Sequence, residues 1–289
     1  MNWVRDLAHK HELQADRTAA ATRRAVSARG LRVGRASNVG HVRDHNEDVL
    51  LTFETVQLGA QAVEPLGWFV LADGMGGEQS GEKASALAAR VVTYQFLNEI
   101  LRSYLFNEPR GASQPPLSEV LSEAVSAANR AVHDQVPGGG TTLTCALVLG
   151  ARAYLAHVGD SRAYLFADDK LRQITQDHSL VDRLVALGQI SPSEALHHPQ
   201  RNVLYRAVGQ GDTVEVDTYV EPLPLSSKYR LLLCCDGLWG SVGGDRLEEI
   251  LRTAPTPQET CDRLVEAANV AGGTDNITVV VVEPQEYPG

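Results

Sequence analysis

The sequence predicts an α+β fold in which mostly antiparallel sheets pack together and pairs of helices lie outside them. The first observation is the order of the elements, which runs strands, two long helices, more strands, two helices and a final strand. The second is the absence of regular strand–helix alternation, which argues against a doubly wound parallel sheet. The third is size, because 289 residues that are 43% hydrophobic can bury a large core.

The first half of the chain is predicted to contain three strands and then two long helices. The strands are expected at about 31–38, 48–55 and 66–72. Apolar residues at three- and four-residue spacing predict a helix over 78–106, and Pro, Gly, Asn and Ser mark 107–116 as a loop. A second helix is expected over 118–136, with Ser118 as its N-cap and Pro137 at its end.

The second half returns to strands before it ends in two helices and one last strand. Strands are expected at about 141–149, 151–158, 161–167, 171–175, 213–220 and 229–235. The stretch 177–210 has a different character, because its helical segments are short. Helices follow at about 244–253 and 257–271, and a β-branched run predicts a final strand over 276–283.

A compact domain is predicted over 31–286, after an N-terminal extension of residues 1–30 that is helical or disordered. The extension carries six Lys or Arg and three Asp or Glu, so its charge is +3 and that of the rest is −13, within a net charge of −10. An acidic body argues against non-specific nucleic-acid binding, which needs a basic surface. We therefore expect no nucleic-acid partner.

The sequence also gives expectations about location. No apolar stretch reaches the roughly 18–20 residues of a membrane-spanning helix, and residues 1–30 lack the continuous apolar core of a secretory signal. The four cysteines show no C-x-x-C spacing, and three of them lie in apolar runs, so we interpret them as buried reduced thiols. These observations predict a cytoplasmic protein without a membrane span.

Two apolar strands end in the same dipeptide, Asp-Gly. The run 68–72 leads into Asp73-Gly74, and the run 231–235 leads into Asp236-Gly237. A carboxylate at the end of a strand buried on both faces is unfavourable unless it is paired or bound to a cation. One such dipeptide is usually a turn, but two of them, with further acids at strand ends, indicate carboxylates that converge on a metal.

Other acids occupy similar positions. Glu47-Asp48 precede a short apolar run, Asp275 precedes the last strand, and Asp160 lies in a Gly-Asp-Ser hairpin turn, where a turn role and a metal role both stay open. The candidate ligands share oxygen donors, which suit Mg²⁺ or Mn²⁺ rather than zinc or copper. They are Glu47, Asp48, Asp73, the Gly74 carbonyl, Asp160, Asp236 and Asp275. Two such ions about 3.5–4 Å apart activate a shared water toward a phosphoryl group, and Arg43 offers a guanidinium fork for phosphate oxygens.

The chain resembles the metal-dependent Ser/Thr protein phosphatases of the protein phosphatase 2C-like (PPM) family, in its compact bacterial form. The resemblance covers about residues 31–284, and its strength lies in the order of several individually weak motifs. The matching motifs are Arg43 with Asn46-Glu47-Asp48, Asp73-Gly74-Met75-Gly76-Gly77, Gly140-Thr141-Thr142, Gly159-Asp160-Ser161-Arg162, Asp236-Gly237-Leu238-Trp239 and Asp275-Asn276-Ile277-Thr278. It implies a two-sheet antiparallel β-sandwich flanked by pairs of helices (α-β-β-α), with a variable flap at about 177–205.

The resemblance implies how the acids share the metals. Asp73 bridges two ions, Asp236 and Asp275 complete the first site, and Glu47 and the Gly74 carbonyl serve the second. The implied cofactors are two core Mn²⁺ or Mg²⁺ ions.

The remaining implied roles concern water, phosphate and a third ion. Asp48 orients a metal-bound water, Arg43 binds the substrate phosphate, and Asp160 helps to hold a third, weaker ion. The implied reaction is hydrolysis of phosphoserine and phosphothreonine in proteins by a metal-bridging water or hydroxide, in opposition to a Ser/Thr kinase. The implied partners are phosphorylated proteins and that kinase, and we expect a monomer.

One position departs from the family pattern. Many members carry His directly after the Asp-Gly of the bridging aspartate, as a suggested general acid, whereas this chain carries Met75. The proton for the leaving alkoxide then has to come from a metal-bound water or another group. The histidines at 178, 197 and 198 are interpreted as solvent-exposed flap residues, and Asn276 as a turn or supporting residue.

Two other classes of function are compatible with parts of the pattern. A two-metal phosphodiesterase or small-molecule phosphatase shares the acids, but it usually adds His ligands that this set lacks. A non-catalytic member of the family would bind phosphoproteins or relay a signal. Such a protein normally loses metal carboxylates, which this chain retains.

Overall fold

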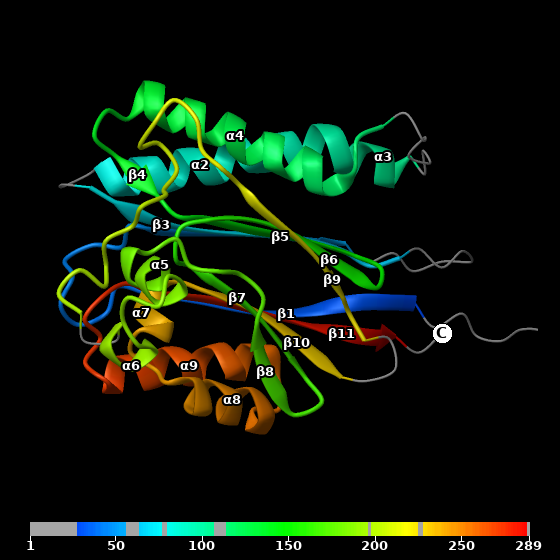
Figure 1. The fold of residues 1–289 in the computed structure, drawn as a ribbon. Coiled ribbons are helices and arrows are strands. Elements are labelled where there is room, and N and C mark those ends of the chain that lie inside the picture. Colours follow the sequence, from blue (N-terminus) through cyan, green and yellow to red (C-terminus); the bar gives the residue numbers. More distant parts are fainter. Residues whose placement is uncertain are drawn as a thin grey trace, which may run out of the picture.

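The computed structural model of the 289-residue chain describes residues 28–55, 64–76, 80–106, 114–195, 198–224 and 228–287. Two antiparallel sheets lie face to face, and helices cover both outer faces (Figure 1). The predicted α+β sandwich flanked by pairs of helices is confirmed. Residues 1–27 of the predicted extension lie outside the described residues, so the domain boundary near residue 31 stays a prediction.

The first sheet joins the two ends of the described chain. Its strand order is β1-β11-β10-β7-β8, with every neighbouring pair antiparallel. The strands are β1 (Ala28–Asn38), β11 (Ile277–Tyr287), β10 (Tyr229–Cys234), β7 (Arg162–Ala167) and β8 (Lys170–Gln173). β1 and β11 pair along their whole length, from Ala28 opposite Tyr287 to Asn38 opposite Ile277.

The second sheet carries the remaining strands. Its order is β2-β3-β5-β6-β9, and the short β4 pairs with the end of β3. The strands are β2 (Asp48–Thr55), β3 (Leu66–Met75), β4 (Gly140–Thr141), β5 (Leu143–Leu149), β6 (Arg152–Val158) and β9 (Asp217–Pro222). Its pairings are antiparallel as well, so short turns and helical excursions suffice to connect the strands.

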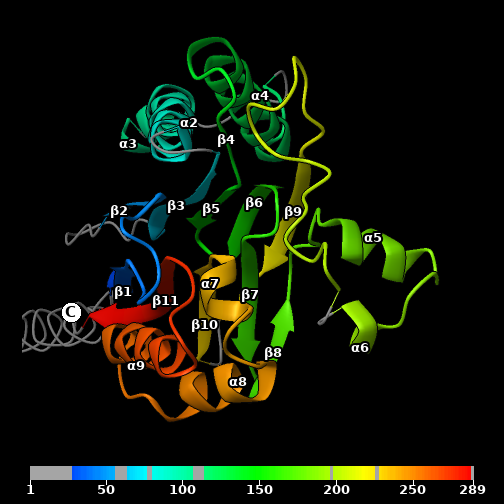
Figure 2. The same ribbon diagram turned by 90° about the vertical axis from the view of Figure 1, so that its left-hand side faces the viewer.

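Helix pairs cover the two outer faces, as the end view in Figure 2 shows. α2 (Ser80–Phe96) and α4 (Leu117–Gln135) lie on the second sheet, and α8 (Gly244–Thr253) and α9 (Pro257–Val270) lie on the first. The sandwich therefore has three apolar layers, one between the sheets and one beneath each helix pair.

The central strands supply side chains to two of these layers at once. In β3, Trp68 and Val70 belong to the layer under α2 and α4, whereas Phe69 and Leu71 belong to the layer between the sheets. Successive side chains of a strand point to opposite faces. A strand buried on both faces thus has to be apolar at every position, which explains the continuous runs in the sequence.

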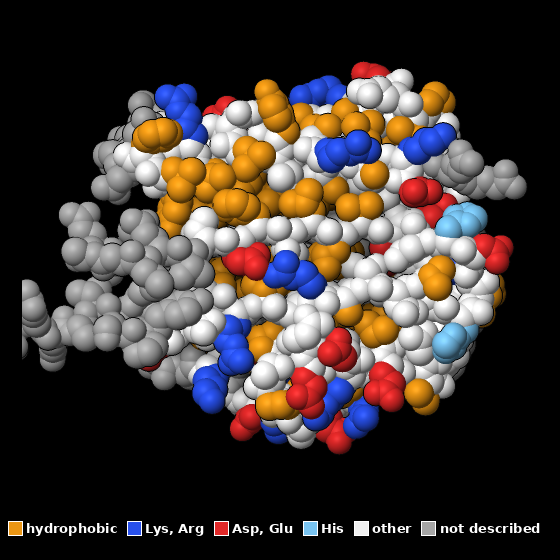
Figure 3. Space-filling view, turned by 180° about the vertical axis from the view of Figure 1, so that it is seen from behind, with side chains coloured by type: hydrophobic (Ala, Val, Ile, Leu, Met, Phe, Trp, Pro, Cys, Tyr) orange, Lys and Arg blue, Asp and Glu red, His pale blue; other side chains and the backbone are white. Residues whose placement is uncertain are grey.

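The helical cover is incomplete along one edge. Figure 3 shows apolar side chains gathered where α2 lies over the edge strand β2. Phe53 of β2 packs against the layer under α2 but is only half-buried.

Some predicted elements differ from the structure. The predicted helix 78–106 runs without interruption through α2, a π-helical turn η1 (Leu97–Leu101) and α3 (Arg102–Leu105), so it differs from the prediction only in the geometry of that turn. The predicted strand 213–220 begins only at Asp217, because Val214 and Val216 pack against the core without sheet pairing. A one-turn helix α7 (Asp236–Trp239) follows β10 where the sequence predicted only a turn. Among the described residues, no helix is long and apolar enough to cross a membrane.

Candidate active site

The candidate ligands converge at one end of the sandwich. Asp48 opens β2 and lies directly opposite Asp73 near the end of β3 in the sheet register. Asp236 opens α7 after β10, Asp275 precedes β11, and Asp160 lies in the turn between β6 and β7. Figure 2 looks onto this end, where the loop before β2, the loop before β11 and α7 come together. Strand pairing places Asp48 beside Asp73, and the stacking of the two sheets brings the other acids to the same end.

Asp73 is fixed through its backbone by two threonines. Thr142 Oγ1 accepts a hydrogen bond from the Asp73 amide at 3.0 Å, and the Thr142 amide donates to the Asp73 carbonyl at 2.9 Å. Thr141 Oγ1 donates to the same carbonyl at 2.9 Å. The two threonines therefore hold the end of β3 through its backbone.

Asp48 is the clearest sign that a cation belongs here. It is buried, and neither of its carboxylate oxygens has a hydrogen-bond partner among the described residues. Burial raises its pKa to about 7, and the charges of Asp236 and Asp275 add to this rise. The Thr278 hydroxyl and the Cys235 thiol are near enough to moderate the rise but form no hydrogen bond of ordinary geometry. A buried, unpartnered carboxylate is unfavourable unless it is protonated or lies beside a cation.

Burial and the charges of neighbouring acids also raise the pKa values of the other carboxylates in the cluster. Burial, and then the charge of Asp48, raise the pKa of Asp73 well above its usual value. Burial and Asp275 raise the pKa of Asp236 to about 6, and burial and Asp236 raise that of Asp160. One ligand atom each from Asp48, Asp73 and the Cys235 thiol lies within 4.8 Å of the others. This carboxylate-rich donor set fits Mg²⁺ or Mn²⁺, whose charge would offset the repulsion.

Glu47 lies against the start of α2. The Gly74 amide donates to the Glu47 carbonyl at 3.2 Å, and Ser85 Oγ donates to the same oxygen at 2.6 Å. A Cβ atom at Gly74 would lie 2.3 Å from the Gly81 carbonyl oxygen, so only glycine allows this approach of strand and helix. Burial raises the pKa of Glu47 as well.

Arg43 stands at the rim of the acid cluster. Its Nη2 donates to Asp275 Oδ2 at 2.8 Å, and its side chain is 50% exposed. The hydrogen bond to Asp275 is the main reason that the pKa of the guanidinium is raised, and the charges of Glu47 and Asp73 contribute. A half-exposed guanidinium beside carboxylates can turn toward an incoming phosphate.

Asn276 organises the site more than its sequence position indicated. Its Oδ1 accepts from the Glu47 amide at 2.8 Å, and its Nδ2 donates to the carbonyls of Val39 and His45 at 3.0 Å each. One amide side chain thus fixes the loop that carries Arg43 and Glu47 against the strand that follows Asp275. A lone Asn in a turn gave no signal for these partners, because they lie more than two hundred residues away in the sequence.

Asp160 is held by a neighbour that sequence reasoning missed. Trp239 Nε1 donates to the Asp160 carbonyl at 2.9 Å, and the Arg162 guanidinium lies 3.4 Å above the Trp239 ring. Arg162 also makes a two-nitrogen contact with the Asp177 carboxylate, at 2.9 and 2.7 Å. Asp177 thereby connects the start of the flap to the Asp160 turn.

The flap region corrects one prediction. His178 is buried, not solvent-exposed, and hydrogen-bonds to the Asp160 turn. His198 is half-buried, and His197 lies outside the described residues. The flap itself contains α5 (Leu180–Ala186) and α6 (Pro192–Ala195). Met75 contacts the Gln210 amide at 3.6 Å through its sulfur, so it packs and offers no proton.

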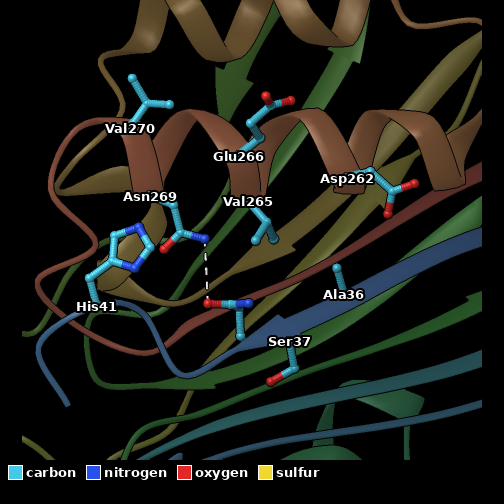
Figure 4. Close-up of a pocket in the computed structure, with 9 residues that line it drawn as sticks. Ala36, Ser37, His41, Asp262, Val265, Glu266, Asn269 and Val270 are labelled. Atoms are coloured by element: carbon cyan, nitrogen blue, oxygen red, sulfur yellow. Dashed lines mark hydrogen bonds between the residues drawn. The ribbon is translucent and has the colours of Figure 1, made fainter.

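A groove of about 480 Å³ lies behind the loop that leads to Arg43, between the end of β1 and α9 (Figure 4). His41 and Asn269 line it, and Asn269 Nδ2 donates to Asn38 Oδ1 at 3.4 Å. None of the candidate ligands lines this groove. This groove is therefore separate from the acid cluster.

Comparisons with known proteins agree with this geometry. The family model for Protein phosphatase 2C matches residues 33–184. The serine/threonine phosphatase stp of Listeria innocua is 40% identical over 244 residues, which are 84% of this chain and 92% of that protein. The serine/threonine protein phosphatase PstP of Mycobacterium tuberculosis is 39% identical over 263 residues, which are 89% of this chain and 46% of that protein.

Solved structures show the same fold. The crystal structure of the M. tuberculosis phosphatase PstP/Ppp has a TM-score of 0.72 at 37% identity, and the match covers 90% of this chain and 99% of that one. The catalytic domain of PstP in complex with two manganese ions has a TM-score of 0.70 at 36% identity, over 88% of this chain and 98% of that one. The chain therefore belongs to the protein phosphatase 2C family, and it is a protein phosphatase.

Proposed function

We propose that this enzyme hydrolyses phosphoserine and phosphothreonine in proteins with the help of divalent metal ions, in opposition to a Ser/Thr kinase. The observation that carries the proposal is the unpartnered, buried carboxylate of Asp48 within a cluster of acids, with Arg43 at its rim. The names of the relatives support the substrate class, because stp and PstP are both serine/threonine phosphatases.

Each acid has a role in this proposal. Asp73 is the ligand shared by two core ions, Asp236 and Asp275 complete one site, and Glu47 and the Gly74 carbonyl serve the other. When bound, divalent ions of this kind lower the pKa of water toward neutrality and offset the charge of a phosphoryl group. Two manganese ions in the PstP catalytic domain support the number of core ions. We propose Mn²⁺ or Mg²⁺ for these sites, and a third, weaker ion near Asp160.

Two further residues act on the reactants. The free oxygens of Asp48 are available to accept a hydrogen bond from a water molecule and so to orient it toward phosphorus. Arg43 turns its guanidinium from Asp275 to the phosphate oxygens, which favours a dianionic phosphate monoester at the rim. Met75 has no proton to donate, so the proton for the seryl or threonyl oxygen has to come from a metal-bound water or another group.

The test is phosphate release from a phosphothreonine peptide, with Mn²⁺ and with EDTA. We expect release that EDTA abolishes and that Asp236→Asn reduces by orders of magnitude. Asp134→Asn is the matched control, because it makes the same chemical change at an exposed position on α4. Hydrolysis of a nucleotide diester to its monoester, without phosphate release from phosphopeptides, would favour the phosphodiesterase class. Binding of a phosphopeptide without turnover, across several peptides and metals, would favour a non-catalytic member.

A further inference from the structure

The Asp160 turn is tied to the base of the flap by a reciprocal pair of hydrogen bonds. The Gly159 amide donates to His178 Nδ1 at 3.0 Å, and the His178 amide donates to the Gly159 carbonyl at 2.7 Å. One bond restrains the peptide before Gly159, and the other restrains the peptide that joins Gly159 to Asp160. His178 therefore holds the backbone on both sides of the residue that precedes this acid.

These contacts define the state of the imidazole. Because Nδ1 accepts a hydrogen bond from an amide, the ring is neutral and carries its proton on Nε2. Nε2 lies 3.2 Å from Asp217 Oδ2, to which it donates. Arg206 Nη1 lies 3.0 Å from Nε2 and donates to the other oxygen of the same carboxylate at 2.7 Å. The ring is thus oriented by Asp217 in the way that carboxylates orient histidines around functional sites.

The ring is also closely packed. The His178 side chain is 2% exposed, and its ring lies 4.9 Å from that of His157. On the opposite side of Gly159, whose φ is +112°, a Cβ atom would lie 2.6 Å from Thr142. Gly159 is therefore enclosed between His178 and Thr142, and Thr142 also holds Asp73.

His178 also closes the flap at its base. Its carbonyl accepts from the Tyr205 amide at 3.0 Å, and the neighbouring Leu180 amide donates to the Val203 carbonyl at 2.7 Å. The chain that leaves the flap then pairs with Thr141, where Val208 and Thr141 exchange hydrogen bonds of 2.9 and 3.0 Å. One end of the flap thus attaches to the Asp160 turn, and the other attaches to β4, which pairs with the end of β3 at Gly74.

We propose that His178 is a positioning residue: its Nδ1 fixes the Gly159 amide, sets the direction of the Asp160 side chain, and couples that direction to the flap through Asp217 and Arg206. The hydrogen bonds of His178 connect the flap to the Asp160 turn. The effect of these bonds on a weaker ion at Asp160 rests on the proposed function. The residue differs from an ordinary buried histidine because one particular acceptor atom, at the δ position, does the positioning.

Two substitutions separate the two ends of the ring. His178→Asn retains an acceptor at the δ position and loses the ε contact with Asp217, whereas His178→Gln retains the ε group and loses the δ acceptor. In metal-free protein, hydrogen exchange of the Gly159 amide measured by NMR should be about 2- to 10-fold faster in His178→Gln, the range expected for one lost hydrogen bond. The rate in His178→Asn should stay close to that of wild type. Equal exchange rates in wild type and His178→Gln would overturn the proposal.

The second measurement links the contact to Asp160. In the metal-loaded enzyme, His178→Gln should raise the Mn²⁺ concentration needed for full kcat by a similar factor. The His178→Asn variant should need about the same Mn²⁺ concentration as wild type. In an Asp160→Asn background the same His178→Gln change should have no further effect, because the acid that it positions is gone. An undiminished effect in that background would show that His178 acts elsewhere.

The two measurements distinguish failure of the positioning role from failure of the proposed function. An inactive wild-type protein would remove the proposed function, but the Gly159 exchange rates would still decide whether the histidine holds the turn. Normal activity with unchanged exchange rates would leave the phosphatase intact and remove the positioning role.

Discussion

Asp48→Asn should stabilise the metal-free protein while it impairs the enzyme. Burial raises the Asp48 pKa from 3.8 to about 7 in the folded state, a shift of about three units, each worth about 1.4 kcal/mol. Because the pKa is higher in the folded state, ionisation of Asp48 destabilises the folded protein. This loss of stability is absent below pH 3.8, grows as pH rises, and is complete above pH 7. The neutral amide of Asn cannot ionise and so removes this loss of stability. In EDTA at pH 8, Asp48→Asn should therefore increase the free energy of unfolding by about 4 kcal/mol.

Urea unfolding in EDTA at pH 5 and pH 8 measures this difference. At pH 5, Asp48 is ionised in the unfolded protein but largely protonated in the folded protein, so only part of the destabilisation is present. The increase in the free energy of unfolding caused by Asp48→Asn should therefore fall to about 2 kcal/mol. Asp134→Asn, at an exposed position, should change stability by less than about 0.5 kcal/mol at either pH. No gain from Asp48→Asn at pH 8, or a gain that is larger at pH 5, would refute the view that this carboxylate is buried and unpaired.

Two further changes test other parts of the site. Arg43→Lys keeps the charge and loses the planar fork, so kcat/KM for a phosphothreonine peptide should fall about tenfold. Urea-measured stability should stay unchanged, because the side chain is 50% exposed; equal kcat/KM values would argue against phosphate contact. Gly237→Ala places a Cβ atom 2.0 Å from the Asn276 carbonyl oxygen and should lower the free energy of unfolding by about 1–3 kcal/mol. The control Gly244→Ala meets no atom within 4 Å, and equal stabilities of these two variants would contradict the steric argument.

The candidate ligands could be found in the sequence because each one follows or precedes a strand with an unusual composition. Asp73 and Asp236 end runs that are apolar at every position, which is a pattern of strands buried on both faces. An acid at the end of a buried strand is unfavourable unless it is paired or bound to a cation. Because the Asp-Gly dipeptide occurs at two such strand ends, the sequence indicated a shared metal site. The family resemblance then gave each acid a role that its own chemistry allows.

The supporting residues could not be found in this way. Asn276, Asp177 and His178 are ordinary polar residues in their local sequence, and His178 was interpreted as exposed although the structure buries it. Their partners come from segments that are distant in the chain, and no local pattern encodes such a pairing. The π-helical turn η1 after α2 is a similar case, because the apolar spacing of the sequence continues through it.

The sequence by itself determined which segments are strands and helices, which faces are apolar, and which acids stand at strand ends, because these features depend on side-chain periodicity within a few residues. Only the tertiary structure decided that Asp48 lies opposite Asp73, that Asn276 fixes the Glu47 loop, and that His178 holds the Asp160 turn. The physical reason is that these contacts follow from strand register and sheet stacking. Both depend on how all the apolar faces are buried together.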